Sequence, residues 1–338
     1  MLVPFVIDAE SLAPDAEWPP PVQRACHRDL LDIWLRIGVL VYDGPSLLQS
    51  RLYRSIQALP QALRSDWQKM LQRGPVLPAA AWTGTVDVMS LDHLATAARV
   101  ALVEDARAEV EFQLQDQDED LRNAKGAEIS VCRIVAANRA SPFLNALALS
   151  GVHIEPKDRF DEIWELRFSQ LARADIKTVN IVDRYAVGKH YGHRQTSASG
   201  LSGLARFLTM LDRTASGDRT VTVFSQWTPE LNASPKKTIG DIEVDMRQIL
   251  TRLSNHRIKR LRVCMVGSSG FREDSHDRFI RFGDYVWDIG IGLEVFEGAH
   301  APKRSSATFK TGNAVIESYR RVESELSGYR DVQVCELR

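Results

Sequence analysis

A histidine and an arginine stand two residues apart in the segment SHDRFIRFG, which begins at Ser275. In a β-strand, side chains at this spacing point to the same face of the sheet. His276 and Arg278 would then present a titratable donor and a fixed cation to one anion. The pair predicts a phosphate-binding site on a strand, and leaves open whether a phosphodiester is cut there or only bound.

Two further segments could contact phosphate. The segment GKHYGHR directly follows the apolar run VNIVDRYAV, and we interpret it as a loop at the end of a strand. Its four potential cations are Lys189, His190, His193 and Arg194. In the second segment, GSSG, the backbone N–H groups of Ser268 and Ser269 could cradle a phosphate. The alternatives are an exposed basic loop without a specific role and an ordinary flexible turn.

The first third of the chain carries acids at the ends of its predicted strands. These acids are Asp8, Asp43, Glu104 and Asp105. Carboxylates gathered at the carboxyl edge of a parallel sheet can hold divalent metals that activate water against a phosphodiester, and in outline this half resembles PIN-like nucleases. The alternative is that acids end strands because solvent begins there. If the resemblance holds, these four side chains would form a divalent-metal site.

Apolar runs alternate with helical patterns in this half. PFVID, VLVYD and VALVE read as buried strands, and they should be neighbours in one sheet. Helical spacing covers residues 22–37, 46–71 with a break near Pro60, and 90–98. This alternation is typical of an open α/β sheet.

The composition changes at residues 113–126, a polar and acidic segment that we interpret as a linker or a solvated helix end. After it, helices and strands alternate again, and a hairpin is predicted around Gly283 and Asp284. The prediction is therefore an α/β protein of two domains. The N-terminal α/β domain spans residues 1–125, PIN-like or Rossmann-like in its sheet, a connecting segment spans 126–154, and a C-terminal α/β domain spans 155–338.

Two patches in the second half resemble the phospholipase D-like domain found at the C-terminus of MIT (microtubule-interacting and trafficking) proteins. They are VNIVDRYAV with the following GLARFLTML, and HDRFIRFGDYVWDIGIGLEVF. The resemblance covers roughly residues 155–300. Phospholipase D-like phosphodiesterases use a His-x-Lys signature, so it implies that His276 attacks phosphorus, that Arg278 replaces the lysine, and that Asp284 orients the imidazole from a position displaced by one.

The resemblance leaves catalysis open. Eukaryotic members bind phosphoinositides and partners, whereas hydrolysis in the wider superfamily needs two facing histidines. This chain shows one such signature, so cleavage would need a homodimer that pairs two copies of His276, or a second histidine such as His190 or His193. Arginine in place of lysine favours binding, because a planar guanidinium is a different group from a compact ammonium.

Composition sets the remaining expectations. Lys and Arg number 43 against 44 for Asp and Glu, so no global field draws the chain to nucleic acid, and the four cysteines lack metal-ligand spacing. No apolar run approaches the roughly 20 residues of a membrane span, which predicts a cytoplasmic protein. The joining of a nuclease-like half to this second domain resembles the two-domain effectors of microbial conflict systems. The resemblance implies a nuclease-type effector of a microbial defence system that acts on nucleic acid, as a homodimer or a subunit of a defence complex. The alternative is a non-catalytic phospholipase D-like module that binds an anionic ligand or a protein partner.

Overall fold

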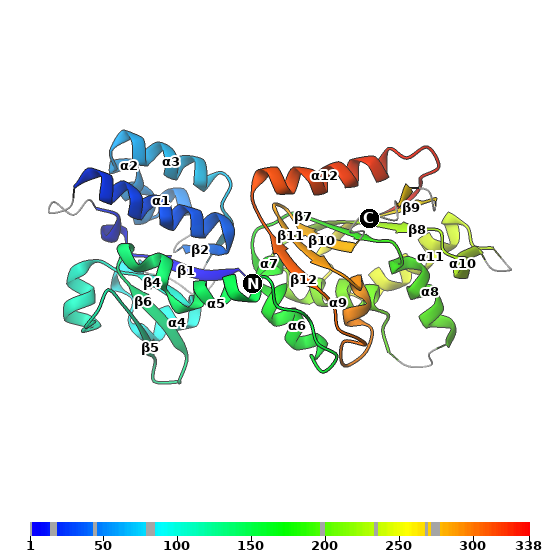
Figure 1. Cartoon of the computed structure of the whole chain (residues 1–338), viewed down its shortest axis with the longest axis horizontal. Coiled ribbons are helices and arrows are strands. Elements are labelled where there is room, and N and C mark those ends of the chain that lie inside the picture. Colours follow the sequence, from blue (N-terminus) through cyan, green and yellow to red (C-terminus); the bar gives the residue numbers. More distant parts are fainter. Residues whose placement is uncertain are drawn as a thin grey trace. The chain divides into compact units, whose positions relative to one another are not determined.

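The computed structural model describes residues 2–13, 19–42, 46–78, 85–196, 200–232, 236–267, 270–271 and 278–338. The chain forms two compact units, Met1–Leu149 and Ser150–Arg338, each built on its own sheet (Figure 1). Both units mix helices with a mixed sheet, as the α/β prediction requires. Among the described residues, no helix combines the length and the apolar character that crossing a membrane requires.

The first unit contains a six-stranded sheet in the order β3-β2-β1-β4-β6-β5. Its strands are β1 (Val3–Ile7), β2 (Gly38–Tyr42), β3 (Val76–Pro78), β4 (Val100–Leu102), β5 (Asp118–Arg122) and β6 (Glu128–Cys132). All pair in parallel except β5, which runs antiparallel to β6. The predicted adjacency of PFVID, VLVYD and VALVE is confirmed, because β1 lies between β2 and β4. The chain builds outward from β1 in one direction and then in the other, so the β1–β4 boundary is a topological switch point.

Helices cover both faces of this sheet. They are α1 (Pro20–Arg36), α2 (Arg51–Ala58), α3 (Gln61–Leu71), α4 (Leu91–Ala97) and α5 (Ser141–Leu149). Phe5 of β1 contacts Trp34 of α1 and Phe143 of α5 at ring distances of 6.0 and 5.9 Å. The next residue, Val6, points to the other face and packs in a cluster with Leu94 of α4. The period-2 alternation of a strand therefore places α1 and α5 on one face and α4 on the other.

Two segments of the first unit differ from the prediction. The acidic stretch 113–126 was interpreted as a linker or helix end, yet it contains β5, an edge strand whose polar side chains are only partly buried. Residues 126–154 were predicted to connect the domains, but β6 is an inner strand of the first sheet, with β4 and β5 as its neighbours. An edge strand needs no continuous apolar run, since solvent reaches it.

The second unit contains a seven-stranded sheet in the order β12-β11-β10-β7-β8-β9-β13. Its strands are β7 (Thr178–Asp183), β8 (Arg219–Gln226), β9 (Ile258–Val266), β10 (Arg278–Phe282), β11 (Tyr285–Ile289), β12 (Ala307–Lys310) and β13 (Gln333–Leu337). β7, β8 and β9 are parallel and the other pairs antiparallel. The predicted hairpin is confirmed: β10 turns into β11 through Gly283, whose φ of 54° lies in the left-handed region.

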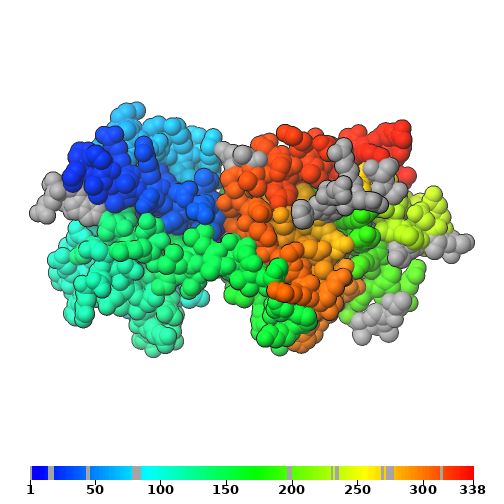
Figure 2. All heavy atoms as spheres, in the orientation of Figure 1, coloured from blue at the N-terminus to red at the C-terminus, as the bar shows by residue number. Residues whose placement is uncertain are grey.

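The helices of the second unit are α6 (Phe160–Arg167), α7 (Ser169–Arg173), α8 (Ala186–Thr196), α9 (Gly203–Thr214), α10 (Pro229–Asn232), α11 (Ile239–Thr251) and α12 (Asn313–Ser327). On one face, Phe282 of β10 packs with Phe168 and Phe207 at ring distances of 6.3 Å. On the other, Phe279 packs against Tyr319 of α12 at 4.8 Å. The outer side of α12 forms part of the surface of this unit (Figure 2).

Six shorter helical turns are also present in the described part of the chain. They are η1 (Ala9–Leu12), η2 (Leu47–Gln49), η3 (Val86–Val88), η4 (Arg107–Glu111) and η5 (Ile134–Arg139) in the first unit. In the second unit, η7 (Gly292–Phe296) follows β11. The segment GKHYGHR, predicted as a loop, lies inside α8. Both of its glycines, Gly188 and Gly192, are accommodated within the helix.

Candidate functional site

Asp8 directly follows β1 and is buried, with 1% of its surface exposed. Nη1 of Arg107, from η4, donates to both carboxylate oxygens at 2.8 and 3.0 Å. The same guanidinium also donates to the carbonyl oxygens of Val86 and Met89. Burial raises the pKa of Asp8 to about 7, because the loss of hydration outweighs the attraction of Arg107. Asp8 is therefore a structural partner of an arginine.

The predicted metal site is not assembled among the described residues. Arg133 binds Asp105 at 2.7 Å and Glu109 at 2.9 Å, so a second guanidinium occupies this part of the edge. No group of three or more His, Cys, Asp or Glu side chains in the described part of the chain could hold a metal ion. The physical reason is that arginine cations stand where a divalent cation would have to bind. Asp43 lies outside the described residues.

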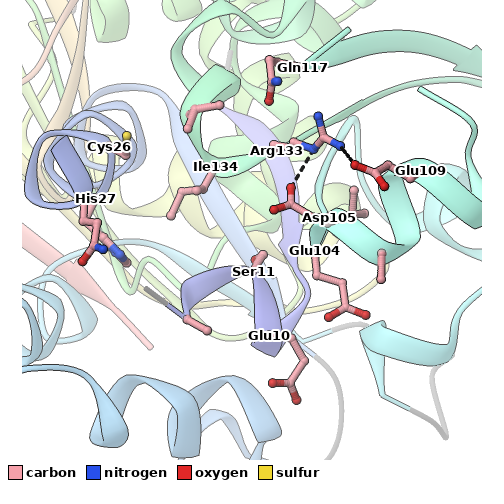
Figure 3. A pocket seen from close by; sticks show the side chains of 15 residues that line it. Glu10, Ser11, Cys26, His27, Glu104, Asp105, Glu109, Gln117, Arg133 and Ile134 are labelled. Atoms are coloured by element: carbon pink, nitrogen blue, oxygen red, sulfur yellow. Dashed lines mark hydrogen bonds and ion pairs between the residues drawn. The ribbon is translucent and has the colours of Figure 1, made fainter. Parts of the chain in front are cut away.

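A pocket of about 460 Å³ opens at the carboxyl edge of this sheet (Figure 3). Its walls come from η1, from the segments that follow β4 and β6, and from the face of α1 that carries Cys26 and His27. Glu104 also lines it; its side chain has no ion-pair or hydrogen-bond partner among the residues that the structure describes. The pocket thus lies at the switch point between β1 and β4, where α/β sheets bind ligands, and its volume suits a small molecule.

In the second unit, the start of β10 lies beside the end of β7, because the two strands are antiparallel and Arg278 pairs with Asp183. Asp183 is buried, and its two carboxylate oxygens accept the backbone N–H groups of Tyr185 at 3.0 Å and Leu293 at 2.8 Å. Burial raises its pKa, although both amides favour the charged form. Gly292, at φ 60°, permits this contact, since a Cβ there would lie 2.2 Å from Asp183 Oδ2.

Two cations of this edge converge on one acid. Lys189 of α8 forms an ion pair with Oε1 of Glu294, in η7, and Nη1 of Arg278 lies 3.7 Å from the same oxygen. The guanidinium of Arg278 also lies over the ring of Tyr185, at 4.8 Å from its centroid. Arg194, predicted to join this cluster, instead pairs with Asp245 of α11. The predicted four-cation group is thus dispersed, with Lys189 at Glu294 and Arg194 at Asp245.

The two histidines of α8 lie close to this edge. His190 is buried, and its Nδ1 lies 2.6 Å from Ser202 Oγ, while its Nε2 has no hydrogen-bond partner within the described ranges. Burial, with help from Arg194 and His193, lowers the pKa of His190 to about 4, so the ring is neutral at pH 7. His193 Nδ1 lies 3.7 Å from Glu297. The cavity that His190 shares with Asp183 and Glu294 has a volume of about 10 Å³, the space of a single water at most.

The remaining predicted residues are placed as follows. His276, Ser268 and Ser269 lie outside the described residues, so the spacing rule for His276 and Arg278 stays a prediction. Asp284 is a correction: it lies at the β10–β11 turn and bonds Arg320 at 2.5 Å, at the edge of the sheet opposite to Arg278. The length of β10 therefore lies between Asp284 and Arg278, so Asp284 is not placed to orient an imidazole near Arg278.

The acid beside Arg278 is Asp183, to which the sequence analysis gave no role. The sequence could have indicated Asp183, because it ends the buried strand in VNIVDRYAV. An acid at the end of a predicted strand was also the reason for selecting Asp8. Comparison with known proteins adds no assignment to this edge: no protein-family profile matches the chain, and no curated protein matches it.

Proposed function

We propose that the protein recognises a phosphodiester-bearing ligand, with nucleic acid as the candidate, through the edge of the second unit at the end of β7. One observation carries this proposal: Lys189 and Arg278, from different elements, meet at a single carboxylate oxygen of Glu294. A position that satisfies a helix lysine and a strand arginine at once is suited to an anion.

Glu294 stands where the anion would bind. A phosphodiester carries one negative charge, like a carboxylate, so it can replace Glu294 between the two cations without a change in the charge balance. Arg278 retains the Tyr185 ring beneath it during such an exchange, which keeps the guanidinium in place. Binding therefore requires the Glu294 side chain to move. Its release from Lys189 and Arg278 costs free energy, which lowers the affinity for the ligand.

Cleavage is the extension of this proposal, in which the chain acts as a nuclease-type effector of a microbial defence system. His276, two residues before Arg278, would be the nucleophile. His190, near the same edge, has an Nε2 atom without a hydrogen-bond partner among the residues that the structure describes. The non-catalytic alternative is favoured by the small volume of the cavity, about 10 Å³, and by the engagement of Lys189 and Arg278 with Glu294.

The binding test measures fluorescence anisotropy of labelled single-stranded DNA and RNA of about 20 nucleotides, longer than the footprint of one module. We expect Lys189→Ala and Arg278→Ala to weaken binding by about tenfold each, and Glu294→Gln to strengthen it by about fivefold. Arg320→Ala is the matched control, since Arg320 is an exposed arginine at the opposite edge of the same sheet. Equal losses in Arg278→Ala and Arg320→Ala would contradict the proposal.

The cleavage test uses the same oligonucleotides with EDTA present, because phospholipase D-type chemistry needs no metal. If His276 attacks phosphorus, His276→Ala should retain most binding and lose all product. Binding by the wild-type chain without product, with and without magnesium, would establish the non-catalytic alternative. Product that disappears only with EDTA would point to metal chemistry and would remove His276 from the mechanism.

A further inference from the structure

The pocket of the first unit, about 460 Å³ in volume, is not used by the phosphodiester proposal. We propose that it binds a small organic cation, an amine or guanidinium carried on an apolar body. The inference is independent of the phosphodiester site, since the pocket residues all belong to the first unit.

The position of the pocket is fixed by the sheet. Segments that follow β1, β4 and β6 diverge at the switch point, and the crevice between them needs no movement to form. Its apolar wall includes Val103, at the end of β4, and Ile134 and Val135, after β6. A ligand with an apolar body can therefore bury surface there.

The charges of the pocket favour a cation. Asp105 and Glu109 share Arg133, and Glu10 bonds Arg51 at 2.5 Å. Glu104 is left without a compensating partner in the described part of the chain, and Figure 3 shows its carboxylate turned away from Arg133. With Arg133 as the only described cation among the lining residues, an anion would meet net repulsion.

A second, independent feature is a hydrogen-bond acceptor that a donor group of the ligand could satisfy. The side-chain oxygen of Gln117, which lines the pocket, is buried and has no hydrogen-bond partner among the described residues. An unpaired buried acceptor costs free energy that an N–H group of a ligand would recover. His27, buried on the α1 wall, accepts a hydrogen bond from Trp67 through Nδ1, so it adds no positive charge while neutral.

A bare metal ion is a poorer occupant than an organic cation. The described residues provide no group of three His, Cys, Asp or Glu ligands, and two of the lining acids are already bound to Arg133. An amine needs fewer ligands, because one carboxylate and one carbonyl oxygen satisfy two of its N–H groups. The combination of Glu104, Gln117 and an apolar wall therefore selects a cationic organic molecule.

The test compares three probes with one ring and different charges: tryptamine (cation), tryptophol (neutral) and indole-3-acetate (anion). Isothermal titration of the full chain should show binding in the order tryptamine, tryptophol, indole-3-acetate, with a gap of about tenfold between the first two. Equal affinity for the three probes, tighter binding of indole-3-acetate, or no tryptamine binding at millimolar concentration would overturn the proposal.

Two variants test charge and shape separately. Glu104→Gln should weaken tryptamine about fivefold and leave tryptophol unchanged, whereas Glu128→Gln, at the opposite end of β6, should change neither. Ala106→Trp places a ring in the pocket without altering its charge and should abolish binding of both probes. A tryptamine affinity that survives both Glu104→Gln and Ala106→Trp would place the binding elsewhere. Oligonucleotide binding should be unchanged in both variants, so a failure here leaves the phosphodiester proposal intact.

Discussion

The carboxyl edges of the two sheets hold their buried aspartates in opposite ways. Asp8 is held by the guanidinium of Arg107, a charged side chain from another element. Asp183 is held by two backbone N–H groups and lies next to a strand that begins with Arg278. The pocket at the first edge has a volume of about 460 Å³, and the cavity at the second edge has a volume of about 10 Å³.

The difference indicates that the ligand charge an edge favours depends on which charged side chains remain without an ion-pair partner inside the unit. At the first edge, arginines take up Asp8 and Asp105, and Glu104 remains. At the second edge, one acid, Glu294, takes up two cations. The same position in two α/β sheets thus carries an acid without a described partner in one unit and two cations held by one carboxylate in the other, and the two proposals rest on this difference.

The largest expected effect is the loss of Arg107. Above pH 7, where Asp8 is ionised, Arg107→Met should lower the opening free energy of β1 and β4 by about 3–5 kcal/mol, because it leaves a buried carboxylate without its partner. Arg278→Met, at the second edge, should lower the opening free energy of β10 by about 1 kcal/mol or less. Hydrogen–deuterium exchange of the full chain measures both units separately. Similar losses in the two variants would remove the contrast between the edges.

A smaller effect is expected from the pKa of Asp8, which is about 7 in the folded unit against about 3.9 in an unfolded chain. Between these values the folded unit keeps a proton that the unfolded chain releases, so this stabilisation is complete below about pH 4 and is lost as the pH rises through 7. From pH 5 to 8 the wild-type first unit should lose on the order of 1–3 kcal/mol more than Asp8→Asn.

Urea unfolding followed by tryptophan fluorescence checks this difference, since Trp34 and Trp67 are buried in the first unit. Asp66→Asn is the control, because Asp66 lies in α3 and, among the described residues, its side chain makes only a surface contact of 3.8 Å with Lys69. Its stability should follow the wild-type pH dependence. Parallel pH curves for the wild type and Asp8→Asn would show that Asp8 is ionised throughout this range.

The smallest effect is expected at Asp284. Asp284→Asn should change the stability of the second unit by less than about 1 kcal/mol, since it breaks one exposed ion pair with Arg320. It should also leave oligonucleotide binding and any cleavage unchanged, whereas Asp183→Asn should weaken binding by disturbing the contact with η7. A loss of activity in Asp284→Asn equal to that in His276→Ala would restore the role that the resemblance implies for it.

Several elements could be predicted because their cause is local. The strands of PFVID, VLVYD and VALVE are continuous buried runs, and the break at Pro60 and the turn at Gly283 follow from backbone restrictions. β5 was missed because an edge strand carries polar side chains. The helix α8 was missed because its two glycines and scattered charges hide its buried side, which carries Val187 and His190.

The site was less predictable, because it depends on pairs that are distant in sequence. The linear distance from His276 to Asp284 suggested proximity, yet the predicted hairpin itself places the turn one strand length from the start of β10. Nothing in the spacing of Asp8 indicates Arg107, and nothing near Lys189 indicates Glu294. Sequence patterns located the acids and cations, but which of them neutralise one another is decided by tertiary structure.

The Asp8–Arg107 pair joins positions 99 residues apart and so bears on the rates of folding and unfolding. Neither group can leave water favourably before the other is in place, because a lone buried charge costs several kcal/mol. The pair should therefore form after the folding barrier has been crossed and break before the unfolding barrier is reached. An interaction of this kind slows unfolding more than it accelerates folding. The lifetime of the folded first unit, and its resistance to proteases that act on opened chains, would then depend on this one ion pair.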